Sequence, residues 1–276
     1  MKITLFGTCR LLGIENYFQC TDIHSAVSYV HSTKEIIQLI KFLKGETIPH
    51  PINRYCFRAG IIEKRDIVHS DELLDAFNNT DLFVVEISST KTYRYKKYYV
   101  HHLAVDKRLE FYKDTPAEIE KNTIIAQQNN NEIENDLDEI RKLLKPKKIL
   151  VVSHINARIP KNSFFFSIGI LNKYISNILY RLANVEDNSF SFMDSLVKTK
   201  LITKRNNLIK LLEDITTQKD INFFDPSVLL QKYSQQEILI EEKYGYPPGH
   251  YTDFGQKKVG ELFADKIRTI ISAAPP

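Results

Sequence analysis

Four hydrophobic segments along the chain have the length of β-strands. Residues 2–7, 82–87 and 148–153 are almost continuously apolar, and residues 221–224 form a shorter candidate. Continuous apolar runs that end in glycine or at polar residues are typical of strands buried on both faces. The pattern therefore predicts a sheet with other elements packed on both sides.

Helical periodicity occupies the segments between these runs. Residues 34–43 have apolar side chains at helical spacing behind a cap at Ser32 or Thr33, and Gly45 ends the segment. The further helix candidates are residues 71–77, 132–144, 171–182, 206–214 and 254–271. Alternating strands and helices are typical of a parallel sheet with right-handed crossovers. We therefore expect an α/β fold with a central, mainly parallel sheet flanked by helices.

The length of 276 residues fits a single domain over 1–276. Residues 127–135 are polar and low in complexity, which predicts a mobile insertion near 113–135. The featureless tail 273–276 could be a linker to another domain. No internal repeat is visible.

The composition and charge of the chain limit the classes of binding partner that we expect. A net charge of +4 is spread along the chain, whereas nucleic-acid binders concentrate basic residues on one face, so we expect no nucleic-acid partner. A small basic surplus favours anionic small molecules such as a nucleotide, a nucleotide sugar or coenzyme A. No segment is apolar enough to span a membrane, and Arg10 interrupts the apolar start before any signal-peptide cleavage site. The oligomeric state stays open.

The three cysteines, Cys9, Cys20 and Cys56, are odd in number and unrelated in spacing. This argues against a disulfide framework and against a zinc site of paired cysteines, so we expect no metal. Reduced thiols predict a cytoplasmic protein. Cys20 and Cys56 are most simply structural.

Cys9 has the setting of a nucleophile. The sequence Gly7-Thr8-Cys9-Arg10 follows the first strand directly, and open α/β sheets present ligand-binding residues at the carboxyl ends of their strands. Helix amides and the cation of Arg10 would favour the reactive thiolate. A buried cysteine after a strand is, on the other hand, usually a small core residue.

Near the other end of the chain, His250 is followed five residues later by Gly255, at the start of the last helix candidate. Together with Gly7-Thr8-Cys9, this order resembles the SGNH or GDSL hydrolase superfamily, whose members open with Gly-Asp-Ser and close with such a histidine. It looks like the branch opening with Gly-Ser-Cys or Gly-Thr-Cys, which includes acetyltransferases of polysaccharide biosynthesis that bind coenzyme A. Segments 84–89 and 222–227 resemble the middle motifs of that branch.

The resemblance implies an SGNH-like three-layer sandwich with Cys9 as nucleophile and His250 as base. It also implies substrate-binding or oxyanion-hole roles for Thr8, Arg10, Gly60, Ser88 and Ser89, besides the amide of Cys9. The clearest departure is the acid expected three residues before the histidine, where this chain has Pro247. Cys9 and His250 could act as a dyad, or Asp253, Glu242 or a backbone carbonyl could orient the imidazole.

Other polar residues have weaker patterns. His154 follows the strand 148–153 at the same sheet edge as Cys9, so it is a candidate, although a loop histidine is as simple a reading. His101 and His102, beside Tyr98 and Tyr99, could line a sugar or adenine pocket or belong to a lid. Arg158 and the lysines Lys145, Lys147 and Lys148 could meet phosphates, but solvated surface charge is the simpler reading.

The leading hypothesis is an acetyltransferase that uses acetyl-CoA and acetylates a sugar hydroxyl or amino group on a nucleotide sugar or glycan precursor. Cys9 is then an acyl carrier or an oxyanion-hole element, and His250 deprotonates the acceptor. Two alternatives stay open: an esterase or deacetylase on acylated carbohydrate, and a non-catalytic carbohydrate-binding domain. Walker, Rossmann and His-Glu-x-x-His motifs are absent from the sequence, which gives no support to nucleotide hydrolysis, hydride transfer or zinc proteolysis.

Overall fold

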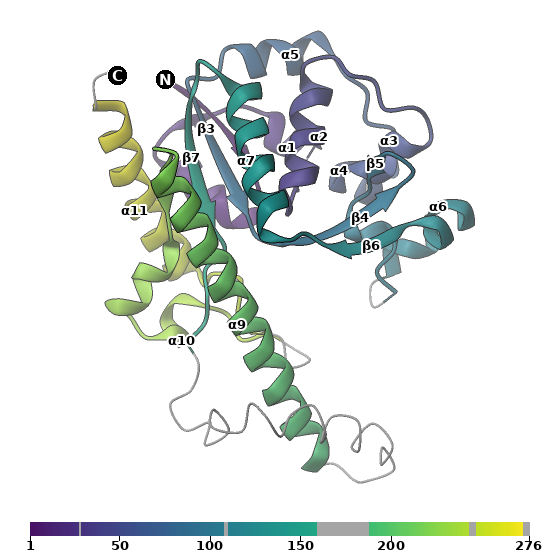
Figure 1. Ribbon diagram of the computed structural model, residues 1–276. Coiled ribbons are helices and arrows are strands. Elements are labelled where there is room, and N and C mark those ends of the chain that lie inside the picture. The colour runs from purple at the N-terminus through teal and green to yellow at the C-terminus, as the bar shows by residue number, and fades with distance from the viewer. Residues whose placement is uncertain (28, 108–109, 159–187, 243–246, 273–276) are drawn as a thin grey trace.

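The computed structural model describes residues 1–27, 29–107, 110–158, 188–242 and 247–272, the first ten of the 188–242 segment as helical backbone only. Figure 1 shows these elements around a central twisted sheet. Its strands are β1 (Lys2–Phe6), β2 (Gln19–Cys20), β3 (Leu82–Ile87), β7 (Lys148–Ser153) and β8 (Asn222–Phe224). All pairs are parallel, in the order β2-β1-β3-β7-β8. The predicted parallel α/β fold is confirmed.

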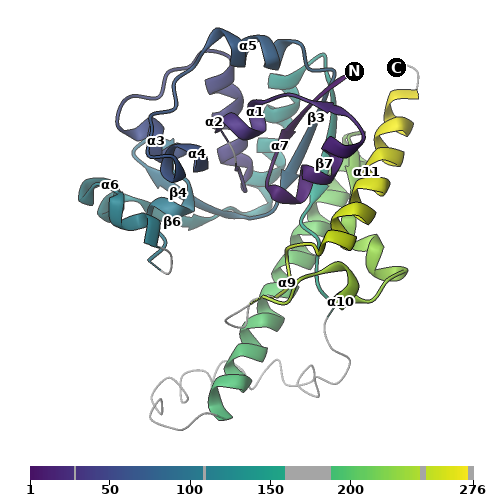
Figure 2. The same cartoon turned by 180° about the vertical axis from the view of Figure 1, so that it is seen from behind.

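Alternate residues of each strand enter two separate hydrophobic cores, as the period of two in a strand requires. From β3, Phe83 and Val85 pack into one core, whereas Leu82 and Val84 pack into the other. The first core lies under α1 (Ile23–Val27), α2 (Thr33–Leu43), α7 (Asn130–Leu144) and the end of α9 (Asn188–Gln218). The second lies under η1 (Cys9–Asn16), η5 (Pro226–Gln231), α10 (Gln235–Ile238) and α11 (Asp253–Ser272). Figures 1 and 2 show α2 and α7 on one side of the sheet and α11 on the other, so the sandwich has three layers.

The strand order changes direction at β1, and this position matters for function. The chain passes from β1 to β2 on one side, and then to β3 on the other side of β1. Loops that leave neighbouring strands in opposite directions leave a crevice at the carboxyl edge, where open α/β sheets bind ligands. Cys9 follows β1 at this crevice.

A second, antiparallel sheet was not anticipated from the sequence. It consists of β5 (Tyr98–Tyr99), β4 (Lys91–Tyr95) and β6 (Ile124–Gln127), in that order. The remaining short elements are α3 (Ile52–Cys56), α4 (Arg58–Ile62), α5 (Asp71–Asn78), η2 (His102–Ala104), η3 (Glu110–Asp114) and α6 (Ala117–Asn122).

The segment near 113–135, which the sequence predicts to be a mobile insertion, contains regular secondary structure. Residues 124–127 are β6, and Asn129 forms a capping box with Glu132 that starts α7 two residues earlier than predicted. Ile133 lies in the first core with 1% of its surface exposed. The polar side chains at the start of α7 face solvent, and their number makes the buried apolar stripe of this helix difficult to recognise in the sequence.

Other helices agree with the pattern in part. Ser32 caps α2 through a capping box with Glu35, as predicted for the 34–43 segment. The 206–214 prediction is the middle of the much longer α9. The helix predicted at 171–182 and the tail 273–276 lie outside the described residues. Among the described helices, none is long and apolar enough to cross a membrane.

Candidate functional site

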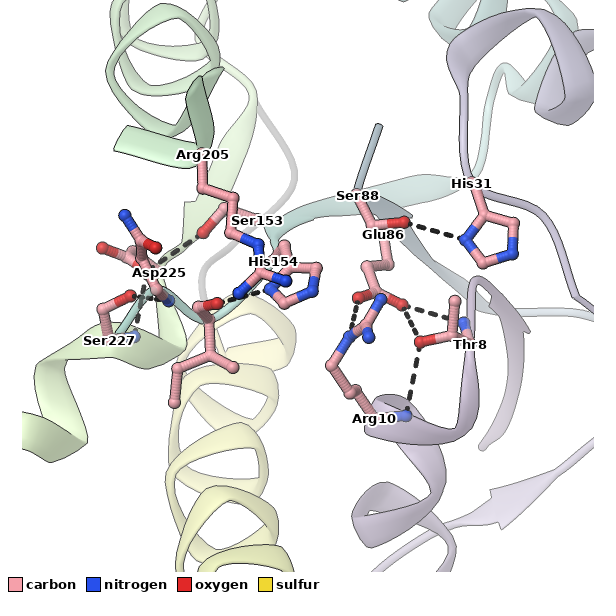
Figure 3. Close-up of polar contacts among 12 residues, drawn as sticks. Thr8, Arg10, His31, Glu86, Ser88, Ser153, His154, Arg205, Asp225 and Ser227 are labelled. Atoms are coloured by element: carbon pink, nitrogen blue, oxygen red, sulfur yellow. Dashed lines mark hydrogen bonds and ion pairs between the residues drawn. The ribbon is translucent and has the colours of Figure 1, made fainter. Parts of the chain in front are cut away.

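The turn that carries Cys9 is held by a buried carboxylate on the neighbouring strand. Glu86, near the end of β3 and only 1% exposed, accepts hydrogen bonds from the amide of Thr8 at 2.8 Å and from its hydroxyl at 2.7 Å. It also accepts from Nε of Arg10 at 2.6 Å, as Figure 3 shows. Gly7 is required here, because a Cβ would lie 2.6 Å from the Cβ of Glu86. The turn and Cys9 are therefore fixed to β3 as well as to β1.

These contacts bear on the roles expected for Thr8 and Arg10. Both donor groups of Thr8 are taken by Glu86, so Thr8 holds the turn and has no donor left for a substrate. Arg10 uses Nε for Glu86 while its side chain also lines the cleft beside Cys9. Its outer guanidinium nitrogens therefore suit an anionic or carbonyl oxygen in that cleft.

His250 lies on a segment paired with the chain after α10. The amide of Ile240 donates to the carbonyl of His250 at 2.9 Å, and Leu239 and Tyr251 form an antiparallel bridge. This pairing brings Glu242 beside His250, with its Oε1 2.5 Å from Nδ1 of the imidazole. Of the three groups considered for orienting His250, the structure places Glu242 in contact with it. Pro247, at the position expected for the acid, makes no such contact.

The thiol of Cys9 completes this line of side chains. The imidazole of His250 lies close enough to the Cys9 thiol for each group to shift the pKa of the other. Burial alone would raise the pKa of the Cys9 thiol, but the bond to His250 and the charge of Arg10 outweigh burial and lower it. The same bond to Cys9, supported by Glu242, raises the pKa of His250 to about 9. A thiolate at Cys9 and an imidazolium at His250 therefore stabilise each other.

An open cleft of ≈ 550 Å³ lies in front of Cys9 and His250. Its other lining residues are Arg10, Leu12, Asn16, Ile240, Tyr251 and Gln256. Nε2 of Gln256 is buried and has no hydrogen-bond partner among the described residues. As the first residue of η1, Cys9 has an amide with no partner inside that helix. The cleft thus offers the amide of Cys9 as a backbone donor, besides the guanidinium of Arg10.

Tyr29 approaches Cys9 from another direction. Burial, followed by the charge on Cys9, raises the pKa of the Tyr29 phenol, which lies close enough to the thiol to interact with it. The guanidinium carbon of Arg58 stacks over the Tyr29 ring, 4.5 Å from its centroid. Tyr29 therefore places a neutral hydroxyl donor next to the sulfur.

His154 and Arg205 support the His250 loop. Nδ1 of His154 bonds to the carbonyl of Ile155, and burial followed by the charges of Arg10 and Arg205 holds its pKa well below the usual range. Arg205 on α9 donates to the carbonyl of Pro248 at 2.7 Å and weakly to that of Pro247 at 3.4 Å. Burial, then the charge of Arg10, lowers the pKa of Arg205 to about 10. His154 lies at the expected sheet edge, as a neutral group close to the site (Figure 3).

Two of the expected oxyanion donors have amides that are already engaged, and a third residue lies in a tightly packed helix. The amides of Ser88 and Ser89 both donate to the carbonyl of His31, at 2.9 and 3.0 Å. Gly60 lies in α4, where a Cβ would be 2.4 Å from the carbonyl oxygen of Arg54. The glycine at this position is explained by the close approach of α3. The oxyanion or substrate-binding roles of Gly60, Ser88 and Ser89 stay predictions, with the amides of the two serines already engaged in this structure.

The remaining candidates have structural roles or lie elsewhere. Arg158 is exposed and its amide donates to Gln235. Lys147 and Lys148 donate to the carbonyls of Asn78 and Ile270, at 3.0 and 2.8 Å, so both tie down neighbouring elements. Burial raises the pKa of Cys20 to about 12 and that of Cys56 still further, as befits inert thiols.

Segment 222–227 supports the sheet edge. Asp225 caps η5, its Oδ1 accepting from the amide of Ser227 at 2.9 Å and from the hydroxyl of Ser153 at 3.0 Å. This links the ends of β7 and β8 beside His154. The motif is thus explained by a cap that joins two strands.

Three residues of the site were missed by sequence reasoning: Glu86, Tyr29 and Arg205. A charged residue inside an otherwise apolar strand was a visible indication for Glu86, because a buried carboxylate needs partners. Tyr29 and Arg205 have no such indication, since both reach the site through tertiary contacts only.

The chain is similar to a known family model over its first 121 residues and to a known protein at low sequence identity. Residues 1–121 match a family model described as the TviD N-terminal domain. The Vi polysaccharide biosynthesis protein TviD of Salmonella typhi is 23% identical over 307 residues, covering 96% of this chain and 31% of that protein. The chain thus spans about a third of the length of the curated relative it matches.

Similar solved structures are esterases with low identity. A carbohydrate acetylesterase family member from Sinorhizobium meliloti is 10% identical with a TM-score of 0.40, covering 99% of each chain. The native aryl esterase of M. smegmatis is 12% identical with a TM-score of 0.33, covering 97% of this chain and 98% of the other.

Proposed function

We propose that this chain is an acyltransferase that moves an acetyl group from acetyl-CoA to a hydroxyl or amino group of a sugar. The observation that carries the proposal is the line Cys9, His250, Glu242 at the switch point of the sheet, in an open cleft. The 23% identity to a polysaccharide biosynthesis protein supports a carbohydrate acceptor, such as a nucleotide sugar or a glycan precursor.

In the first half-reaction, the Cys9 thiolate attacks the thioester carbonyl of acetyl-CoA. A new carbon–sulfur bond forms, and the tetrahedral intermediate expels the coenzyme A thiolate. That thiolate takes the proton of the His250 imidazolium, which leaves acetyl-Cys9, free coenzyme A and neutral His250. The lowered pKa of the Cys9 thiol favours this step, because it enlarges the fraction of Cys9 present as the attacking thiolate.

In the second half-reaction, neutral His250 removes the proton of the acceptor hydroxyl or amine as it attacks acetyl-Cys9. The acetyl–oxygen or acetyl–nitrogen bond forms, and the Cys9 thiolate leaves beside the regenerated imidazolium. Glu242 keeps Nδ1 protonated and aims Nε2 at the sulfur, and it stabilises the imidazolium in both steps. It therefore acts as a positioning residue.

The negative charge on the carbonyl oxygen needs donors in both half-reactions. The amide of Cys9 and the outer nitrogens of Arg10, two residues that line the cleft, are suited to this purpose. They replace Ser88 and Ser89, whose amides are engaged by His31.

Single-turnover acylation tests the proposal. The chain is mixed with acetyl-CoA without an acceptor, and intact mass followed by peptide mapping locates the label. We expect one acetyl group on Cys9, none in Cys9→Ala, and normal labelling in the matched control Cys20→Ala. Unlabelled Cys9 with no coenzyme A released would overturn the proposal.

The same preparation distinguishes the alternatives. Rapid release of acetate from p-nitrophenyl acetate, without any labelling by acetyl-CoA, would identify an esterase. Absence of both reactions would leave a carbohydrate-binding role, which the contact between Glu242 and His250 argues against.

A further inference from the structure

Three histidines from separate segments meet beside the sheet edge. His31 follows β1 and α1, whereas His101 and His102 follow β5. One nitrogen of each ring lies within 4.8 Å of the other two, and the ring centroids are 4.4 to 5.4 Å apart. Nε2 of His31 and Nε2 of His101 are buried without a hydrogen-bond partner among the described residues. Buried polar groups left unpaired are costly, so these nitrogens call for a ligand.

We propose that His31, His101 and His102 form a binding site for a divalent metal ion of the zinc type. Three imidazoles are the protein ligands of many zinc sites, with a fourth position open to water or a substrate oxygen. The proposal is independent of the acyl-transfer machinery, because it uses none of Cys9, His250 and Glu242.

The geometry fits after small ring movements. Zinc–nitrogen bonds of about 2.0–2.1 Å in a tetrahedral arrangement place the nitrogens about 3.3 Å apart. The rings therefore have to close by roughly 1–1.5 Å, which side-chain rotation supplies. Nδ1 of His31 lies 3.2 Å from the hydroxyl of Ser88, so Nδ1–H can donate a hydrogen bond to the Ser88 oxygen. That tautomer leaves the lone pair of Nε2 for the metal. Figure 3 shows this pair.

His101 gives the proposal a distinctive consequence. Its Nδ1 accepts a long hydrogen bond of 3.3 Å from the amide of Leu103. Binding through Nε2 requires the proton on Nδ1, so the metal bond replaces this weak capping bond. The amide of Leu103 should therefore respond directly to metal.

The surroundings supply charge of both signs. Glu35 is buried and its carboxylate accepts from the amide of His31 at 2.9 Å, which places a carboxyl group behind the ligand. Arg58 and Arg10 are the cations that face the cluster, and Arg10 is paired with Glu86.

Cobalt(II) titration of the whole chain tests the site. We expect one Co²⁺ per chain with the visible absorption of a four-coordinate nitrogen site, displaced by stoichiometric Zn²⁺. The Leu103 amide should shift in ¹H–¹⁵N spectra with Zn²⁺ as the probe. Loss of a ligand in His102→Ala should weaken binding by at least about 100-fold, more than the loss of an outer-shell partner does.

Two controls make the result decisive. His50→Ala, at an exposed histidine paired with Asp66, should bind as the wild type does. Cys9→Ala should also bind normally, which excludes metal capture by the thiol site. If His102→Ala does not fold, His101→Gln provides the second test. Absence of stoichiometric Co²⁺ binding to the wild type, or unchanged binding in a folded histidine variant, would overturn the proposal.

Discussion

Nδ1 of His250 lies 2.5 Å from Oε1 of Glu242, a residue eight positions earlier in the chain. The contact arises because the segment after α10 pairs in antiparallel fashion with the segment before α11, at Leu239 and Tyr251. A motif that expects the acid three residues before the histidine finds Pro247 instead. The acid is supplied by tertiary pairing, so the site has a carboxylate, an imidazole and a thiol in one line.

Glu242→Gln should slow acyl transfer at neutral pH. The amide cannot stabilise the imidazolium and can present its NH₂ to Nδ1, which favours the wrong tautomer. We expect the rate to fall by at least about 10-fold, less than for a serine enzyme because a thiolate needs less help. The pKa of His250 should also fall from about 9, which moves the alkaline limb of the pH profile to lower pH.

The neighbouring Glu241 is a matched control. Its carboxylate is 89% exposed and lies 3.9 Å from Nζ of Lys198. Glu241→Gln should leave both the rate and the pH profile unchanged. Equal behaviour of the two variants would show that Glu242 does not position His250.

Alkylation of Cys9 by iodoacetamide should report its lowered pKa. Because thiolate is the reactive form, the wild type should reach its half-maximal rate at a pH below the ordinary thiol value of about 8.5. In His250→Ala, burial acts without the opposing imidazole and raises the pKa of the thiol. Each unit of that increase lowers the rate at pH 7 by about 10-fold.

Cys20 provides the internal comparison in the same experiment. Burial raises its pKa to about 12, so it should stay unmodified at neutral pH in both proteins. Peptide mapping resolves the sites. Similar profiles for Cys9 in the wild type and in His250→Ala would contradict the coupling of the two groups.

Glu86→Ala should destabilise the fold. Arg10 and the donors of Thr8 lose their partner in a buried setting, and removing one member of a buried ion pair costs about 3 kcal/mol or more. Urea unfolding should show a lower midpoint with an unchanged slope. Glu139→Ala, which removes an exposed pair with Lys41, should cost less than about 1 kcal/mol.

Much of the fold could be predicted from local pattern. Strands β1, β3 and β7 are buried on both faces of the sheet. They therefore stand out in the sequence as continuous apolar runs. The small sheet escaped prediction because β5 has only two residues and β6 is exposed at every position. The start of α7 escaped because its asparagine-rich first turn is polar.

The residues of the site also fall into two groups, those that the sequence indicates and those that it does not. Cys9 and His250 could be singled out because each directly follows or precedes a recognisable element. Glu86 and Arg205 could not be assigned, since their partners lie far away in the sequence. For Ser88 and Ser89, a motif position does not reveal that the carbonyl of His31 occupies their amides.

Arg205 connects α9 to the loop that carries His250, and its replacement should affect chemistry more than folding. In Arg205→Met the carbonyls of Pro247 and Pro248 lose their donors, so the loop is no longer held toward Cys9. We expect a fall of about 10-fold or more in kcat, with a smaller change in KM, since misplacing a catalytic group by about 1 Å has effects of this size.

The pKa of Cys9, measured by alkylation, should rise as the contact with His250 loosens. A purely structural role would lower the unfolding midpoint and leave that pKa in place. Lys204→Met, at the exposed neighbouring position of α9, should change neither quantity.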